Sequence, residues 1–181
     1  TLSSSSAASD VYKRQEYANS LGNTVVDFKG SYLERLGANG YLNGEGAITA
    51  TVSVYKSDQT IERFIGYTMS NDPALFGVIR DGTFNGSLGN HTIYGPSYLI
   101  NSGGKVDALN WYNPAHPERG FGSGYLNMTM IHRTNWDGQA FSEGCLLILG
   151  SQWRDFQNAV GANNNNFTIR LRRENLSQLK Y

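Results

Sequence analysis

The sequence predicts a single, mainly β domain with one or two short helices. Its 181 residues are enough for one packed core and too few for two domains of ordinary size. Short runs of alternating apolar and polar residues recur along the chain, and Gly, Asn, Asp and Ser separate them. Alternation with a period of two is typical of strands that bury one face, and these turn residues are typical of the connections between strands.

We expect the first 44 residues to precede the main domain. Residues 1–15 join a serine-rich tract to the hexapeptide Asp10–Gln15, which resembles read-through of an adapter sequence used in preparing DNA libraries. We interpret them as a non-native leader, with a natural disordered leader as the alternative. Residues 16–44 form a lead-in segment, which has an apolar run at Thr24–Phe28 and a predicted short helix at Tyr32–Leu36. Residues 45–181 then form the main domain.

The first half of this domain reads as strands and turns. Two apolar alternations within Ala47–Ser70, with a polar Ser-Asp turn between them, predict a β-hairpin. Val78–Phe84 predicts a strand that enters a turn, and short strands and loops are expected from there to Gly104. Trp111–Gly124 is rich in proline and glycine and predicts a long irregular loop, the kind of segment that often carries function.

The second half contains a strand, a helix and a last strand. Leu126–His132 alternates apolar and polar residues and predicts a strand that presents His132 at its tip. After Cys145–Leu149, Ser151 is the expected N-cap of a helix that Gly161 ends. Phe167–Arg172 predicts the last strand. A solvated strand face is expected for the nearby basic side chains, which are Arg170, Arg172 and Arg173.

The charge balance and the cysteine count exclude several classes of protein. The 15 basic and 15 acidic side chains cancel, so the chain lacks the basic excess of a nucleic-acid-binding protein. No stretch approaches the roughly 18 consecutive apolar residues of a membrane span. The single cysteine, Cys145, cannot form an internal disulfide, and its thiol is therefore free to react.

Cys145 is the candidate nucleophile, and a nucleophilic cysteine needs a base to supply thiolate near pH 7. His132 is the favoured base, because it ends a strand 13 residues before the cysteine; His91 and His116 are expected to be structural. Gly144 allows a tight turn in which the N–H groups of Gly144 and Cys145 stabilise an oxyanion. Ser142 is expected either to donate to that oxyanion or to hold the loop.

Two short motifs make the prediction specific. Ile131–Asn135 followed by Ser142–Cys145 resembles the signature of the L,D-transpeptidase (YkuD-type) catalytic domains, in which Ile-His-Gly-Thr-Asn precedes Ser-X-Gly-Cys. The resemblance implies a β-sandwich-like fold whose cysteine attacks a peptidoglycan stem peptide at the carbonyl of its third residue, through a thioester and without a metal or other cofactor. It also implies a periplasmic, cell-wall or secreted location.

The chain departs from the family at two positions. Arg133 stands where the family usually has Gly, and Leu147 stands where it usually has an arginine that meets anionic groups of the substrate. We therefore expect Arg133 or Arg119 to take over this contact. By the resemblance, Thr134 and Asn135 also contact the substrate.

Other readings of the same residues are less favoured or stay open. Papain-like enzymes and cell-wall amidases place the cysteine before the histidine, whereas this chain has the reverse order. Zinc binding lacks a paired ligand spacing. Transfer to an amine, as in a transpeptidase, and transfer to water, as in a carboxypeptidase, both fit. A non-catalytic cell-wall-binding or structural module with the same fold is the alternative from another class.

Overall fold

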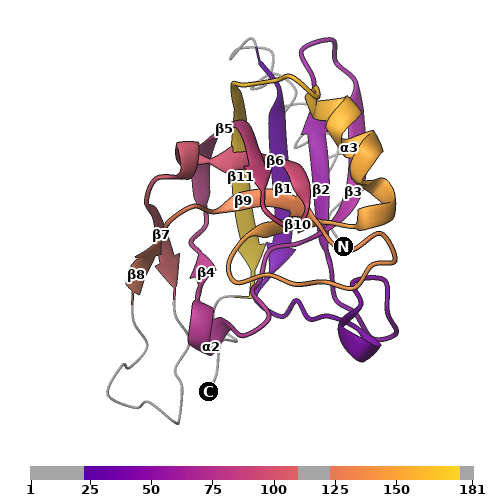
Figure 1. Cartoon of the computed structure of the whole chain (residues 1–181), viewed down its shortest axis with the longest axis vertical. Helices are drawn as coiled ribbons and strands as arrows, with labels where there is room; N and C mark the ends of the chain where they lie inside the picture. The colour runs from indigo at the N-terminus through magenta and orange to yellow at the C-terminus, as the bar shows by residue number, and fades with distance from the viewer. Residues whose placement is uncertain (1–22, 110–122, 176–181) are drawn as a thin grey trace, which may run out of the picture.

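The computed structural model describes residues 23–109 and 123–175. The predicted leader, most of the lead-in before Val25, His116 and Arg119 lie outside the described residues. Within them, most of the chain forms strands, and the two α-helices are short (Figure 1). The predicted mainly β fold with one or two short helices is confirmed.

Eight of the described strands close into a barrel, in the order β1-β11-β5-β6-β9-β10-β3-β2. A β-sandwich has two separate sheets that face each other, whereas these eight strands form one continuous, closed sheet. The pairs β1–β11 and β9–β10 are parallel, and the other neighbours are antiparallel. The barrel strands are β1 (Val25–Ser31), β2 (Ala50–Tyr55), β3 (Ile61–Tyr67), β5 (Gly82–His91), β6 (Gly95–Ile100), β9 (Met130–Arg133), β10 (Leu146–Ile148) and β11 (Phe167–Glu174).

A smaller sheet of the order β4-β7-β8 lies beside the barrel (Figure 1). Its strands are β4 (Val78–Ile79), β7 (Val106–Leu109) and β8 (Ser123–Leu126). The described helical segments are η1 (Ala38–Gly40), α2 (Pro73–Phe76), η2 (Asn101–Gly103), η4 (Gly150–Gln152) and α3 (Trp153–Val160).

The main core fills the barrel with one side chain in two from each strand, as the alternation predicts. Ile131 on β9 and both Leu146 and Ile148 on β10 are fully buried there. The helix α3 packs against the same core, and its Phe156 ring meets Phe64 edge to face at 5.5 Å. Because inward residues of β10 alternate with outward ones, Cys145 and Leu147 lie on the other face from Leu146 and Ile148.

The apolar run noted at Thr24–Phe28 contributes to β1, which begins at Val25, and the hairpin predicted within Ala47–Ser70 is confirmed as β2 and β3. The helix predicted at Tyr32–Leu36 is wrong. Glu34 in this segment is buried, and its carboxylate accepts hydrogen bonds from the Thr68 N–H at 2.8 Å and the Thr68 hydroxyl at 2.6 Å. These hydrogen bonds join residues far apart in the sequence and hold Glu34 in a non-helical turn. A helix over the same residues would break them.

Two predicted strands are each divided in the structure. Val78–Phe84 is split between β4 and β5, because its first residues pair with β7, where the Arg80 N–H donates to the Asp107 carbonyl oxygen, whereas the chain from Gly82 pairs with β11. Leu126–His132 is split between β8 and β9 at Met128, whose φ of 53° is left-handed and interrupts an extended strand. His132 consequently lies inside β9, one residue before its end.

The end of the chain shows one confirmed and two wrong predictions. Gly161 ends α3 with a φ of 103°, as expected for a helix stop. Ser151 is not a side-chain cap, because a 3-10 turn over Gly150–Gln152 leads directly into α3. Arg173 is buried, and its guanidinium donates to the carbonyl oxygens of Thr68 and Ile79, both at 2.6 Å. No helix among the described residues is long and apolar enough to cross a membrane.

Candidate active site

The loop before Cys145 is held in one conformation by the Ser142 side chain. The Ser142 hydroxyl donates to the Cys145 carbonyl oxygen at 2.8 Å and accepts the Gly144 N–H at 3.1 Å. The Ser142 backbone is in turn paired with Asn71, whose side-chain oxygen accepts the Ser142 N–H at 2.7 Å. Of the two roles predicted for Ser142, the structure places it where it holds the loop.

Gly144 is required in this loop for two reasons. Its φ of 133° lies in the region that side-chain-bearing residues rarely adopt, and a Cβ atom there would come within 2.9 Å of the Leu126 side chain. Its N–H is engaged with Ser142. The proposal that the Gly144 and Cys145 amides stabilise an oxyanion stays a prediction, and for Gly144 it requires that the bond to Ser142 be given up.

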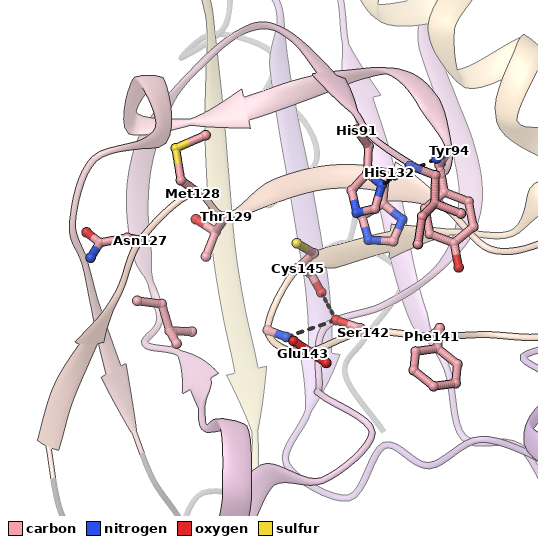
Figure 2. A pocket seen from close by; sticks show the side chains of 13 residues that line it. His91, Tyr94, Asn127, Met128, Thr129, His132, Phe141, Ser142, Glu143 and Cys145 are labelled. Carbon is pink, nitrogen blue, oxygen red and sulfur yellow. Dashed lines mark hydrogen bonds between the residues drawn. The ribbon is translucent and has the colours of Figure 1, made fainter.

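A cavity of about 390 Å³ opens in front of Cys145, within the size range of small-molecule and peptide subsites (Figure 2). Its rim carries apolar side chains that are largely exposed, among them Ile93 and Phe141. Glu143 is the one carboxylate among its lining residues. The wall consists of His91, Ile93 and Tyr94, the segment 126–129, His132 and the loop 141–145.

His132 is buried in the wall of this cavity, with 2% of its surface exposed. Its Nδ1 lies 2.8 Å from the carbonyl oxygen of Arg133, which can only accept, so we assign the hydrogen of the neutral ring to Nδ1. Nε2 is then left without a proton and free to act as a base. Burial is the main cause that lowers the pKa of His132 to about 4; the hydrogen bond with the Arg133 backbone opposes this shift, and the nearby His91 and Arg133 side chains add to it.

Cys145 is partly exposed and lies across the cavity from His132 (Figure 2). Burial raises the pKa of its thiol, the Glu143 carboxylate raises it further, and a hydrogen bond from the Met130 backbone lowers it. Near neutral pH the free protein therefore holds a neutral thiol and a neutral imidazole. This differs from the expected thiolate near pH 7 and favours a mechanism in which His132 removes the proton as the sulfur attacks.

Sequence reasoning missed His91 and Tyr94, which lie at the tip of the β5–β6 hairpin. The His91 ring lies 4.6 Å from the His132 ring, and the Tyr94 ring stacks on His132 at 4.5 Å with an interplanar angle of 10°. The pairing of β6 with β9, which sets Tyr98 opposite Ile131, brings the tip over His132. Gly95 is a local indication of a hairpin. The contact of this hairpin with β9 joins segments far apart in the sequence, and no local pattern indicates it.

The predicted substrate-contacting residues are placed around the site and not in the cavity wall. Thr134 is fully buried, and its hydroxyl donates to the Asn135 carbonyl oxygen and accepts the Gly150 N–H. Asn135 is exposed in the turn that follows. The Arg133 guanidinium lies over the Trp136 ring at 3.9 Å and near the Tyr94 ring at 5.3 Å. These residues therefore support the strand that carries His132, and their contact with substrate stays a prediction.

Leu147, at the position of the family's usual arginine, is fully buried. It pairs in register with His132 and packs in a cluster with Tyr67 and Met69. A side chain at this position lies beside His132, so the buried Leu147 brings no charge to it. Among the described residues, no group of three or more His, Cys, Asp or Glu side chains is arranged to hold a metal ion.

Comparison with known proteins adds a single distant likeness. No family model and no curated protein matches the chain. Among solved structures, the helical cell shape determining protein Pgp2 from Campylobacter jejuni aligns with 89% of this chain at 13% identity and a TM-score of 0.43. The chain spans 56% of the length of that protein. A likeness of this size leaves the function to be argued from the site itself.

Proposed function

We propose that this protein is a cysteine-dependent acyl-transfer enzyme of the L,D-transpeptidase kind, with Cys145 as nucleophile and His132 as general base. One observation carries the proposal: Cys145 and His132 line one cavity, and the His132 ring is oriented by the Arg133 carbonyl so that Nε2 is free to take a proton. A nucleophile, a base and a group that orients the base are the parts that activated thiols require.

The chemistry follows from these groups. As the Cys145 sulfur attacks a peptide carbonyl, its proton passes to Nε2 of His132, and the carbonyl oxygen becomes an oxyanion. When the intermediate collapses, the carbon–nitrogen bond breaks, and the His132 imidazolium returns the proton to the leaving amine. The acyl group remains as a thioester on Cys145. An amine or water then attacks the thioester with His132 again as base, which releases the thiol and gives a new amide or a carboxylic acid.

The substrate class is a stem peptide of peptidoglycan, by the motif resemblance of Ile131–Asn135 and Ser142–Cys145. The acyl donor would be the third residue of the stem, and the enzyme would act in the periplasm, at the cell wall or after secretion. The apolar rim around Ile93 and Phe141 fits the uncharged side-chain and backbone parts of a peptide, and Glu143 fits an ammonium group beside the scissile bond.

The test is capture of the thioester. The protein is incubated with a purified stem tetrapeptide and its intact mass is measured within seconds to minutes. We expect a mass increase equal to the tripeptide acyl group on the wild type and none on Cys145→Ala, with the melting temperature unchanged. A wild-type protein that releases the fourth residue without passing through a Cys145 adduct would contradict the proposal, as would turnover by folded Cys145→Ala.

A second candidate is a non-catalytic module that binds the cell wall. The buried Leu147 in place of the family's arginine and the raised pKa of the Cys145 thiol favour it. It predicts that the protein sediments with isolated peptidoglycan and that Cys145→Ala sediments equally well, while neither protein forms an adduct or releases an amino acid.

A further inference from the structure

Of the two loop amides predicted to stabilise an oxyanion, the Gly144 N–H is already engaged, and so is the Ser142 hydroxyl. The Gly144 N–H is donated to the Ser142 hydroxyl, and the Ser142 hydroxyl is donated to the Cys145 carbonyl oxygen. A tetrahedral intermediate on Cys145 needs donors that point at its oxygen before the reaction begins. A donor from another element of the fold would meet that need without disrupting the loop.

His91 has its proton fixed on the nitrogen that faces away from its own turn. Its Nδ1 accepts the N–H of Ile93 at 3.0 Å and the N–H of Tyr94 at 3.3 Å. A nitrogen that accepts two N–H groups carries no hydrogen, so the neutral ring has its hydrogen on Nε2. Protonation of the ring would place a hydrogen on Nδ1, facing the N–H groups of Ile93 and Tyr94, and would break both hydrogen bonds. The ring is therefore a neutral donor through Nε2, and burial also lowers the pKa of His91.

The position of this donor is set by the aromatic cluster at the hairpin tip. The His91 ring lies 4.6 Å from the ring of His132 and 4.9 Å from that of Tyr94. Figure 2 shows His91 and His132 together on the side of the cavity that faces Cys145. Because His91, His132 and Cys145 line the same cavity, a substrate carbonyl bound at the sulfur would lie in the space that His91 also lines.

We propose that His91 is a second catalytic histidine, whose Nε2–H donates a hydrogen bond to the acyl oxygen while the thioester at Cys145 forms and breaks. The inference rests on the proposed acyl transfer and adds a residue that the motif resemblance does not include. His91 transfers no proton in this role. The thiol proton goes to His132 and then to the leaving amine, and His91 only stabilises the oxygen that becomes negative.

Two substitutions distinguish the proposed donor, Nε2–H of His91, from the acceptor in its turn, Nδ1. In His91→Asn, the side-chain oxygen can still accept the N–H two residues ahead, as asparagine commonly does in turns, but nothing occupies the place of Nε2. His91→Gln extends an amide N–H toward that place. Thr92→Ala changes an exposed side chain of the same turn and serves as the matched control.

The measurements are kcat/KM for release of the fourth residue of a stem tetrapeptide, the rate of alkylation of Cys145 by iodoacetamide, and the melting temperature. We expect kcat/KM to fall about 100- to 1000-fold in His91→Asn, the usual effect of removing one oxyanion donor. It should recover at least in part in His91→Gln and stay at the wild-type value in Thr92→Ala. Alkylation displaces iodide at a CH2 carbon and forms no oxyanion, so its rate should stay within about twofold in all three variants.

Three outcomes would overturn the inference. A kcat/KM in His91→Asn within threefold of an active wild type would show that His91 donates nothing essential. A parallel fall of turnover, alkylation rate and melting temperature would show that His91 only supports the site. If the wild type forms no adduct on Cys145, the proposed function itself fails and the role of His91 fails with it, which the Cys145→Ala mass experiment identifies separately.

Discussion

Acidification should destabilise the wild-type protein more than a variant that lacks the His132 imidazole. The pKa of His132 is about 4 in the folded protein, whereas an unfolded histidine titrates near 6.5. Between these values the unfolded chain binds a proton that the folded protein does not, so the free energy of unfolding falls as the pH is lowered. The contribution is complete above the unfolded pKa and is lost as the pH falls toward the folded one. From pH 7 to pH 4 it amounts to about 3 kcal/mol.

The matched variant is His132→Asn, whose amide can donate to the Arg133 carbonyl oxygen as Nδ1 does but cannot titrate. Urea unfolding followed by tryptophan fluorescence at pH 7, 6, 5 and 4 gives the free energy of unfolding for both proteins. We expect the free energy of unfolding of the wild type to fall by about 3 kcal/mol more than that of His132→Asn between pH 7 and pH 4. Glu34, whose pKa is raised by burial, titrates in both proteins and cancels in the difference.

Parallel curves for wild type and His132→Asn would refute the reasoning, because they would mean that the folded protein binds a proton at His132 as readily as the unfolded chain does. The base would then be charged in mildly acidic solution and unable to take the thiol proton. A matching measurement is the acid limb of kcat/KM, which we expect near pH 4 to 5 and not near pH 6.5.

Two further substitutions test the loop and the buried arginine. Gly144→Ala should lower stability by about 1 to 3 kcal/mol and slow thioester formation, because a φ of 133° is strained for a residue with a side chain and an added Cβ, 2.9 Å from Leu126, would displace that side chain. An unchanged urea midpoint and adduct rate would contradict this. Arg173→Met should cost about 2 to 5 kcal/mol, because it leaves the buried carbonyl oxygens of Thr68 and Ile79 without their donor and removes the cation beside the partly exposed Asp81. The control Arg170→Met, on the outer side of β11, should change the urea midpoint little, and equal losses in the two variants would exclude a special role for Arg173.

Local patterns predicted most of the strands and missed where some of them break. The alternation in Ala47–Ser70 and at Phe167–Arg172 sufficed for β2, β3 and β11, because each of these strands buries one face along its length. At Leu126–His132 the same alternation continues through Met128, whose left-handed backbone divides β8 from β9. The break depends on the contact of Met128 with Gly103 of η2, and a local pattern does not contain that contact.

The sequence by itself determined that the domain is mainly β and that Cys145, as a lone thiol with His132 upstream, is the candidate nucleophile. These follow from residue types and short spacings. The tertiary structure alone determined that His91 lies beside His132, that the Gly144 N–H is engaged by Ser142, and that burial favours the neutral forms of Cys145 and His132. The physical reason is that desolvation and hydrogen-bond partners come from strands far apart in the chain, and barrel closure brings them together.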